Sequence, residues 1–438
     1  MNGEIRVVRV GLIIDGVEIV GKEEFDTESD CLRVGSQHSD KGRSVLEIVD
    51  LHGPCSPFSA TGREPGHDDG QAFKMVINGD QSRVEWINSM SSSPPQSKTV
   101  QDLRQRNSMA DVPVHGGDSL GTGNFIVKVD LGTPKRQFSL VMDTGSGLSW
   151  VQCEPCLLSC YLQKGIRFAP SASVTYKSIP CDSAKCAELK LVFGDGGCSE
   201  SQVCIYSVEY ADNSYSVGFF GQDTLTLTAN DVFPQFSFGG NLSVVSQTAG
   251  KFGRIFAYCL PTGSESGSLA FGADTSYDSV QFTPLLDDDR PFYFVNVVGV
   301  SVGGRPLPVS SSIFVNSGTI IDSGTVITRL ASKAYSELRA AVRSAMAKYP
   351  VAPPYSILDT CYDLSSYANV EYPTIAFHFM GGTNLVLKDV NIFVAPSGGA
   401  SQMCLAFVAN SKEGDVAIIG NCQQKRNLVV YDIDNSRI

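Results

Sequence analysis

Two short segments of the sequence share one arrangement of residues that suits acid–base chemistry. The segment at 141–146 is Val-Met-Asp-Thr-Gly-Ser, and the segment at 320–325 is Ile-Ile-Asp-Ser-Gly-Thr. Each has two apolar residues, an aspartate, a hydroxyl residue, a glycine and a second hydroxyl residue. Asp143 and Asp322 lie 179 positions apart, which is a domain-sized separation. The repeat predicts two similar lobes, each presenting one carboxylate to a shared cleft.

One such segment is weak evidence, because aspartate and glycine are ordinary β-turn residues. Two copies, each preceded by an apolar strand, are much harder to explain as turns alone. Two neighbouring carboxylates share one proton over a wide pH range, because both cannot ionise cheaply. The ionised member takes a proton from a bound water while the protonated member polarises a substrate carbonyl. Asp143 and Asp322 are therefore the candidate catalytic pair.

The residues after each aspartate are suited to hold the carboxylates without filling the cleft. Glycine amides and neighbouring hydroxyl groups donate hydrogen bonds that stabilise a carboxylate. Glycine also lets the backbone turn tightly beneath the acid. The candidate supporting residues are Thr144, Gly145, Ser146, Ser323, Gly324 and Thr325.

The elements that must position these residues are predicted to be mostly β-strands. Short β-rich runs broken by Gly and Ser begin at about residue 123. One helix is expected from a cap at Ser332 to Pro350, because apolar residues recur there at helical spacing. Residues 1–112 are polar without sustained periodicity, which indicates a largely irregular N-terminal region. The expected strands are 124–131, 138–142, 205–210, 224–228, 292–300, 374–379, 384–387 and 428–432.

The composition is that of a globular protein large enough for two or three domains. Of 438 residues, 42% are hydrophobic and 18% are charged. The net charge of −12 argues against nucleic acid as the main partner, because no basic surplus neutralises phosphates. No run approaches 18 uninterrupted apolar residues, so no membrane span is expected.

Thirteen cysteines indicate an oxidising compartment. Seven lie between Cys153 and Cys204, as in a disulfide-stapled segment. Zinc at Cys153, Cys156 and Cys160 is the less favoured alternative, because no second pair stands at ligand spacing. The first twenty residues contain several charges and lack the apolar core of a signal peptide. The cysteines therefore indicate export, and the N-terminus does not.

Further segments complete a pattern over about 113–438. The first Asp-Thr-Gly segment is followed at 148–156 by Leu-Ser-Trp-Val-Gln-Cys-Glu-Pro-Cys, and then by the cysteine-rich insert. Residues 256–261 are Phe-Ala-Tyr-Cys-Leu-Pro, and 418–421 are Ile-Ile-Gly-Asn. The chain resembles the pepsin-like aspartic proteases, specifically the plant nepenthesin-like branch. By this resemblance, residues 208–215 form the flap hairpin that closes over substrate, with Tyr210 as the flap tyrosine.

The resemblance implies a bilobal fold with a central cleft and an aspartic endopeptidase. Residues 1–112 would be a propeptide-like region, 113–288 the N-terminal catalytic lobe, and 289–438 the C-terminal lobe. An Asp143/Asp322 dyad would activate a water that cleaves polypeptide substrates at acidic pH, without metal or organic cofactor. The family also implies a secreted or vacuolar monomer made as a zymogen.

The N-terminal region shares this resemblance. Residues 52–57 (His-Gly-Pro-Cys-Ser-Pro) and 80–84 (Asp-Gln-Ser-Arg-Val) are similar to the propeptide of the branch. We expect an inhibitory prosegment that places a basic residue opposite the dyad at neutral pH. The candidates are Lys98, Arg104 and Arg106.

The chain departs from the family pattern at several places. The C-terminal lobe keeps its inner strand at 418–420, but in the N-terminal lobe the sequence passes from 236–240 directly to 241–247, without the equivalent strand. The sequence also stops at Ile438, before the family's terminal strand, and Cys422 is an extra cysteine. A void beneath Asp143 would cost several kcal/mol. The alternative function is therefore an inactive or weakly active protease-like binding protein.

Overall fold

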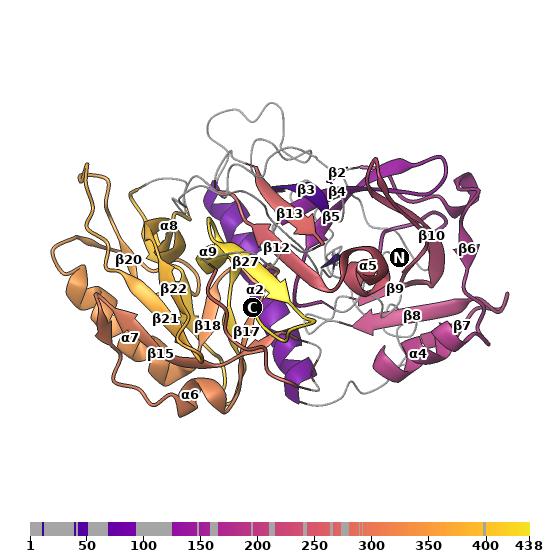
Figure 1. Cartoon of the computed structure of the whole chain (residues 1–438). Helices are drawn as coiled ribbons and strands as arrows, with labels where there is room; N and C mark the ends of the chain where they lie inside the picture. The colour runs from indigo at the N-terminus through magenta and orange to yellow at the C-terminus, as the bar shows by residue number, and fades with distance from the viewer. Residues whose placement is uncertain are drawn as a thin grey trace.

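The computed structural model describes most of the chain after residue 124 and four shorter segments before it. Figure 1 shows two lobes of mainly β-structure with helix α2 (Asp69–Ser92) running between them. The mostly-β, two-lobed architecture predicted from the sequence is confirmed. The described residues are 11–12, 39–40, 43–50, 69–92, 125–146, 149–157, 165–193, 196–209, 215–239, 243–262, 266–272, 280–288, 290, 292–396 and 400–438.

An 11-stranded sheet connects the N-terminal region and both lobes. β27 comes from the end of the chain and lies beside β12, so the sheet joins the two halves of the sequence. β10 (Gly221–Thr228) pairs with β4, with β11 (Asp231–Phe238) and with β6 (Lys177–Ser178), and β2 (Ser39–Asp40) pairs with β3. The main order is β1 (Gly11–Leu12), β5 (Arg136–Met142), β4 (Phe125–Leu131), β3 (Arg43–Asp50), β13 (Gly267–Phe271), β12 (Ile255–Cys259) and β27 (Leu428–Asp432).

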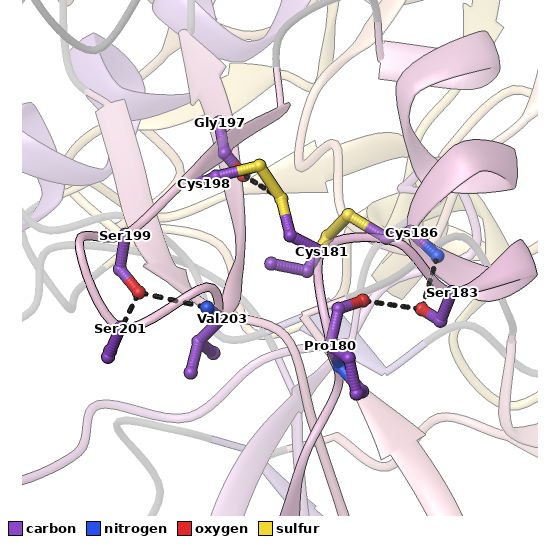
Figure 2. Close-up of a disulfide and its surroundings, with 10 residues drawn as sticks. Pro180, Cys181, Ser183, Cys186, Gly197, Cys198, Ser199, Ser201 and Val203 are labelled. Atoms are coloured by element: carbon purple, nitrogen blue, oxygen red, sulfur yellow. Dashed lines mark hydrogen bonds between the residues drawn. A yellow bond between two sulfur atoms is a disulfide. The ribbon is translucent and has the colours of Figure 1, made fainter.

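A disulfide-stapled subdomain completes the N-terminal lobe. Cys181–Cys198 links the segment before α4 (Ala184–Phe193) to β7 (Gly196–Cys198), and Cys186–Cys204 links α4 to β8 (Cys204–Glu209). Figure 2 shows the first of these disulfides and its surroundings. Each disulfide closes a loop of 17 or 18 residues, which constrains the unfolded chain by about 3 kcal/mol. The predicted disulfide-bonded insert is therefore observed. Its elements, with the neighbouring helices, are β7 (Gly196–Cys198), β8 (Cys204–Glu209), β9 (Tyr215–Phe219), η1 (Pro170–Ala172), α4 (Ala184–Phe193) and α5 (Val244–Phe252).

Three smaller sheets and four helices form the C-terminal lobe. The first sheet is β14 (Phe294–Val295), β17 (Thr319–Ile321), β26 (Ala417–Ile419), β18 (Thr328–Leu330) and β25 (Phe407–Ala409). The second is β16 (Arg305–Pro306), β15 (Val297–Val302), β21 (Ile375–Phe379) and β22 (Asn384–Leu387), and the third is β19 (Val351–Ala352), β20 (Cys361–Tyr362), β24 (Met403–Leu405) and β23 (Phe393–Val394). The helices are α6 (Ser312–Val315), α7 (Ser332–Ala345), α8 (Asp389–Ile392) and α9 (Asn421–Gln424).

The predicted strands and helix correspond closely to observed elements. The strands expected at 384–387 and 428–432 are β22 and β27 without change, and the run at 292–300 is divided into β14 and β15. The predicted helix is α7, but its cap is Ala331, and Ser332 is the first helical residue. The Ser332 hydroxyl instead donates to the carbonyl of Asn410.

Helix α2 was not expected from the sequence. Its buried apolar side chains are Val76, Ile77, Val84, Trp86 and Ile87. The first two pack in a cluster with Val326 and Ile327, just before β18, and with residues of β20, β24 and β25. The other three pack on residues of β14, β17 and β26. A helix with these contacts is anchored in the C-terminal lobe, so part of the region predicted to be irregular is firmly packed.

Each strand that leads to a candidate catalytic aspartate has a parallel neighbour. In the C-terminal lobe β26 pairs with β17, with Ile419 opposite Ile321. In the N-terminal lobe β1 pairs with β5, with Leu12 opposite Met142. Two residues from the N-terminal region thus occupy the position of the inner strand that the family pattern predicts and that the sequence after residue 240 lacks.

Candidate active site

Asp143 and Asp322 directly follow the ends of β5 and β17, and both side chains are fully buried. The two turns interlock across the lobes. The amide of Thr144 donates to Ser323 Oγ at 3.1 Å, and the amide of Ser323 donates to Thr144 Oγ1 at 2.9 Å. These paired hydrogen bonds hold the ends of two strands from different lobes together, which brings the aspartates face to face.

Each carboxylate receives the same pair of donors from its own turn. The glycine amide two residues on donates to Oδ1 at 2.9 Å in both turns. The hydroxyl three residues on donates to Oδ2 in both turns. The donors are Gly145 N and Ser146 Oγ for Asp143, and Gly324 N and Thr325 Oγ1 for Asp322. The repeat seen in the sequence is therefore a repeat of geometry.

The hydroxyls of Thr144 and Ser323 act differently from the sequence-based expectation. They were expected to donate to the carboxylates, but each points to the opposite turn. Thr144 Oγ1 donates to the carbonyl of Ile321 at 3.5 Å, and Ser323 Oγ donates to the carbonyl of Met142 at 3.3 Å. These two side chains thus fasten the lobes together and do not touch the acids.

Arg83 of α2 lies directly over the two aspartates. Its Nε donates to Asp322 Oδ2 at 2.9 Å, and its Nη1 donates to Asp143 Oδ2 at 2.6 Å. Its Nη2 donates to Oδ1 of both acids, at 2.8 Å for Asp322. The side chain of Arg83 is 4% exposed. Because one nitrogen contacts both carboxylates, the guanidinium fills the space between the two acids.

The charges of Arg83 and Asp322 hold each other ionised. Burial opposes a charged guanidinium, but attraction by Asp143 and Asp322 outweighs burial and raises the pKa of Arg83. Burial also opposes ionisation of Asp322, but the charge and hydrogen bonds of Arg83 outweigh it and lower the pKa of Asp322. Protonation of the acid would therefore weaken the hold on Arg83.

Further polar contacts bind α2 to the C-terminal lobe. Asp80 accepts hydrogen bonds from the amides of Val326 and Ile327 and pairs with Arg329. Asn88 Oδ1 accepts from the amide of Val416 at 2.7 Å. Asp80, Arg83 and Asn88 are all buried, so polar contacts as well as apolar packing hold α2 in place.

Sequence reasoning missed the role of this helix. The expected basic residues Lys98, Arg104 and Arg106 lie outside the described residues, and Arg83 takes the expected position. Arg83 stands in the segment that was noted for its similarity to a propeptide. A helical stripe is present in the sequence at 73, 76, 77, 80, 83, 84 and 87. Asp80 and Arg83 interrupt its apolar character, so the pattern was not recognised.

The predicted flap is a hairpin in the structure. β8 and β9 pair antiparallel with Glu209 opposite Tyr215. The tip, with Tyr210, lies outside the described residues. Cys204 at the start of β8 is disulfide-bonded to Cys186, so the base of the hairpin is fixed to the stapled subdomain.

Of the three cysteines considered for zinc, Cys160 lies outside the described residues. The described part of the chain contains no group of three His, Cys, Asp or Glu side chains placed to hold a metal ion. Cys156, a candidate ligand, is disulfide-bonded. The described helices include none that is long and apolar enough to cross a membrane.

Comparison with known proteins places the chain among plant sequences. Residues 125–240 match the family model "Xylanase inhibitor N-terminal", and residues 292–438 match "Xylanase inhibitor C-terminal". An aspartyl protease family protein of Arabidopsis thaliana is 39% identical over 453 residues, which cover 95% of this chain and 93% of that protein. Aspartic proteinase nepenthesin-2 of Nepenthes gracilis is 33% identical over 77% of this chain and 81% of its own.

Solved structures show the same fold at lower sequence similarity. The crystal structure of basic 7S globulin from soybean matches with a TM-score of 0.57 and 19% identity. The match covers 73% of this chain and 92% of that one. At this identity the likeness concerns the fold alone.

Proposed function

Because the chain belongs to the plant pepsin-like aspartic proteases, and is thereby an aspartic-type endopeptidase, we propose that Asp143 and Asp322 are its catalytic dyad. One ionised carboxylate takes a proton from a water held between the two acids. The other, protonated, polarises the scissile carbonyl and then donates a proton to the leaving amine.

The observation that carries this proposal is the symmetric support of the two acids. Each receives one glycine amide and one hydroxyl, and the two turns are fastened by reciprocal hydrogen bonds. Preorganised donors of this kind keep two carboxylates close without further reorganisation during the reaction. A structural turn alone has no need of two matched buried acids that face each other.

We further propose that the described state is latent and that α2 is an inhibitory segment. Arg83 neutralises both acids and fills the space between them. Acidification protonates the dyad, removes the partners of Arg83 and favours release of α2. The proposed enzyme acts at acidic pH for this reason. We also propose that it is secreted or vacuolar and that it acts as a monomer on polypeptides.

Acid incubation of the full chain tests this order of events. We expect cleavage between about residues 95 and 125, detected by N-terminal sequencing, together with the appearance of activity on denatured globin. Cleavage elsewhere, or activity before any acid step, would contradict an inhibitory role of α2.

A protease-like binding protein is the second candidate. It is favoured by the inner strand of the N-terminal lobe, of which the described residues include only Gly11 and Leu12 of β1. A pepstatin-type transition-state analogue distinguishes the two candidates. After acid treatment, the catalytic proposal expects a thermal shift with this ligand that disappears in Asp143→Asn. Absence of any shift in the acid-treated parent chain would favour the binding protein.

A further inference from the structure

A second polar cluster lies next to the aspartate pair and surrounds the carboxylate of Asp80. Oδ1 accepts a hydrogen bond from Val326 N at 2.5 Å. Oδ2 accepts from Ile327 N at 3.2 Å and from Arg329 Nη2 at 2.8 Å. The side chains of Asp80 and Arg329 are 0% and 3% exposed. Three donors that converge on one buried carboxylate form an anion-binding site.

The C-terminal lobe supplies every donor in this cluster, and α2 supplies the acceptors. Arg329 Nη1 donates to Gln81 Oε1 at 2.8 Å, so both described bonds of the guanidinium end on the helix. Arg329 Nε has no hydrogen-bond partner within the described part of the chain. Departure of α2 would leave Arg329 without the acceptors that it has in this state. The three donors all belong to the C-terminal lobe and converge on the place of one carboxylate, so the vacated site favours another carboxylate.

We propose that Arg329 and the amides of Val326 and Ile327 bind an acidic side chain of the polypeptide substrate after α2 leaves, with Asp80 occupying that place in the latent chain. This inference rests on the proposed function, because it assumes that substrate enters where α2 lies. It adds a substrate preference: peptides with Glu or Asp near the cleaved bond.

The geometry of α2 limits where the acidic residue stands in a substrate. Asp80 and Arg83 are three residues apart on a helix, which is about 4.5 Å along its axis. An extended peptide advances about 3.3 Å per residue. Since Arg83 covers the dyad, an acid that replaces Asp80 is expected within about two or three residues of the cleaved bond.

The free Nε favours an acid able to approach Arg329 from the side. Nε and Nη2 share one edge of the guanidinium and match the two oxygens of a carboxylate. Asp80 uses Nη2 of this edge. A Glu side chain on a mobile peptide has the reach to engage both nitrogens, so we expect Glu to be bound at least as well as Asp.

The test uses the acid-activated full chain and C-terminally amidated peptides with one fixed scissile bond. A single Glu is placed at each position of the peptide in turn, and each control peptide has Gln at that same position. At the preferred position, kcat/KM for Glu should exceed that for Gln by about tenfold to a hundredfold at pH 5.5. The ratio should fall toward one as the pH drops below about 4.3, where Glu is protonated. A peptide with a free C-terminus shows whether a terminal carboxylate can replace the side chain.

Two variants break the same ion pair with opposite expected outcomes. Arg329→Gln removes the proposed site and should abolish the Glu preference in the activated enzyme. Asp80→Asn leaves Arg329 in place, so its activated form should keep the preference. If Arg329→Gln does not fold, the proposal is tested by the pH dependence of the Glu-to-Gln ratio of kcat/KM in the parent enzyme. A ratio near one at every position and pH would overturn the proposal.

Binding of the same peptides, followed by fluorescence anisotropy, separates this inference from the proposed function. Tighter binding of the Glu peptide without cleavage of any peptide would contradict catalysis and support the carboxylate site. Cleavage of the Glu and Gln peptides at equal rates would support catalysis and contradict the site.

Discussion

If the chain is latent as we propose, replacing Arg83 by alanine should give a protein that needs no acid step. Arg83 makes hydrogen bonds to both aspartates, and all three groups are buried. Removing one partner of a buried ion pair typically costs about 3–5 kcal/mol. The two acids that remain can share a proton, so they do not stay as an unpaired buried charge. The substitution therefore weakens the binding of α2 more than it destabilises the two lobes.

The corresponding shift toward the open state is about a hundredfold to a few thousandfold, at about 1.4 kcal/mol for each factor of ten. Other anchors of α2 remain, including Asp80 and Trp86, so the helix is loosened and the chain stays folded. We therefore expect Arg83→Ala to cleave a fluorogenic peptide at pH 5.5 without prior acid treatment, at a rate at least a hundredfold above the parent.

The measurement is the initial rate of the intact chain, with gel analysis to exclude prior processing. Lys74→Ala is the matched control, because it removes an exposed positive charge from the same helix. Arg83→Lys keeps the charge but not the forked geometry, so it should be intermediate. Equal latency of the parent and Arg83→Ala would refute the reasoning that this side chain blocks the dyad.

Four further outcomes are expected. The pKa of Asp322 is lower in the folded chain than its ordinary value of about 3.9. The ionised Asp322 therefore stabilises the fold above about pH 3.9, and this stabilisation is lost as the pH falls below that value. Between pH 7 and pH 2 the melting temperature of Arg83→Ala should drop less than that of the parent. Gly145→Ala should lose activity at least a hundredfold and destabilise by about 1–3 kcal/mol, because the added methyl would lie 2.7 Å from Asp322 Oδ1; Gly250→Ala, with open space around it, should retain activity. Leu12→Pro should lower the melting temperature of the full chain if β1 supports β5, and an unchanged value would show that the pairing contributes nothing. Inserting the missing inner strand between residues 240 and 241 should raise activity on denatured globin, and equal activity would show that the shorter lobe suffices.

Local patterns in the sequence were sufficient for the eight expected strand segments and for the aspartate turns, but many other observed strands were not predicted. Alternation of apolar residues and interruption by Gly and Ser depend on neighbours in the chain, so β22 and β27 could be placed to the residue. Helix α7 was recognised for the same reason, since its apolar spacing is uninterrupted. The cap of α7 was misplaced by one residue, because a hydroxyl side chain can bond to a distant carbonyl as readily as to its own helix.

The paired Asp-hydroxyl-Gly segments determined by themselves that two acids belong to one site, because each segment carries its own amide and hydroxyl donors. Three features were decided only by the tertiary structure. Thr144 and Ser323 bond across the lobes, Arg83 covers the acids, and Asp80 occupies a carboxylate site made by β18 and the turn before it. Each depends on groups more than 170 residues apart that meet only when the lobes and α2 are packed together. The stripe of α2 could not be recognised from hydrophobicity, since its central positions are charged and are stabilised only by partners in the folded lobe.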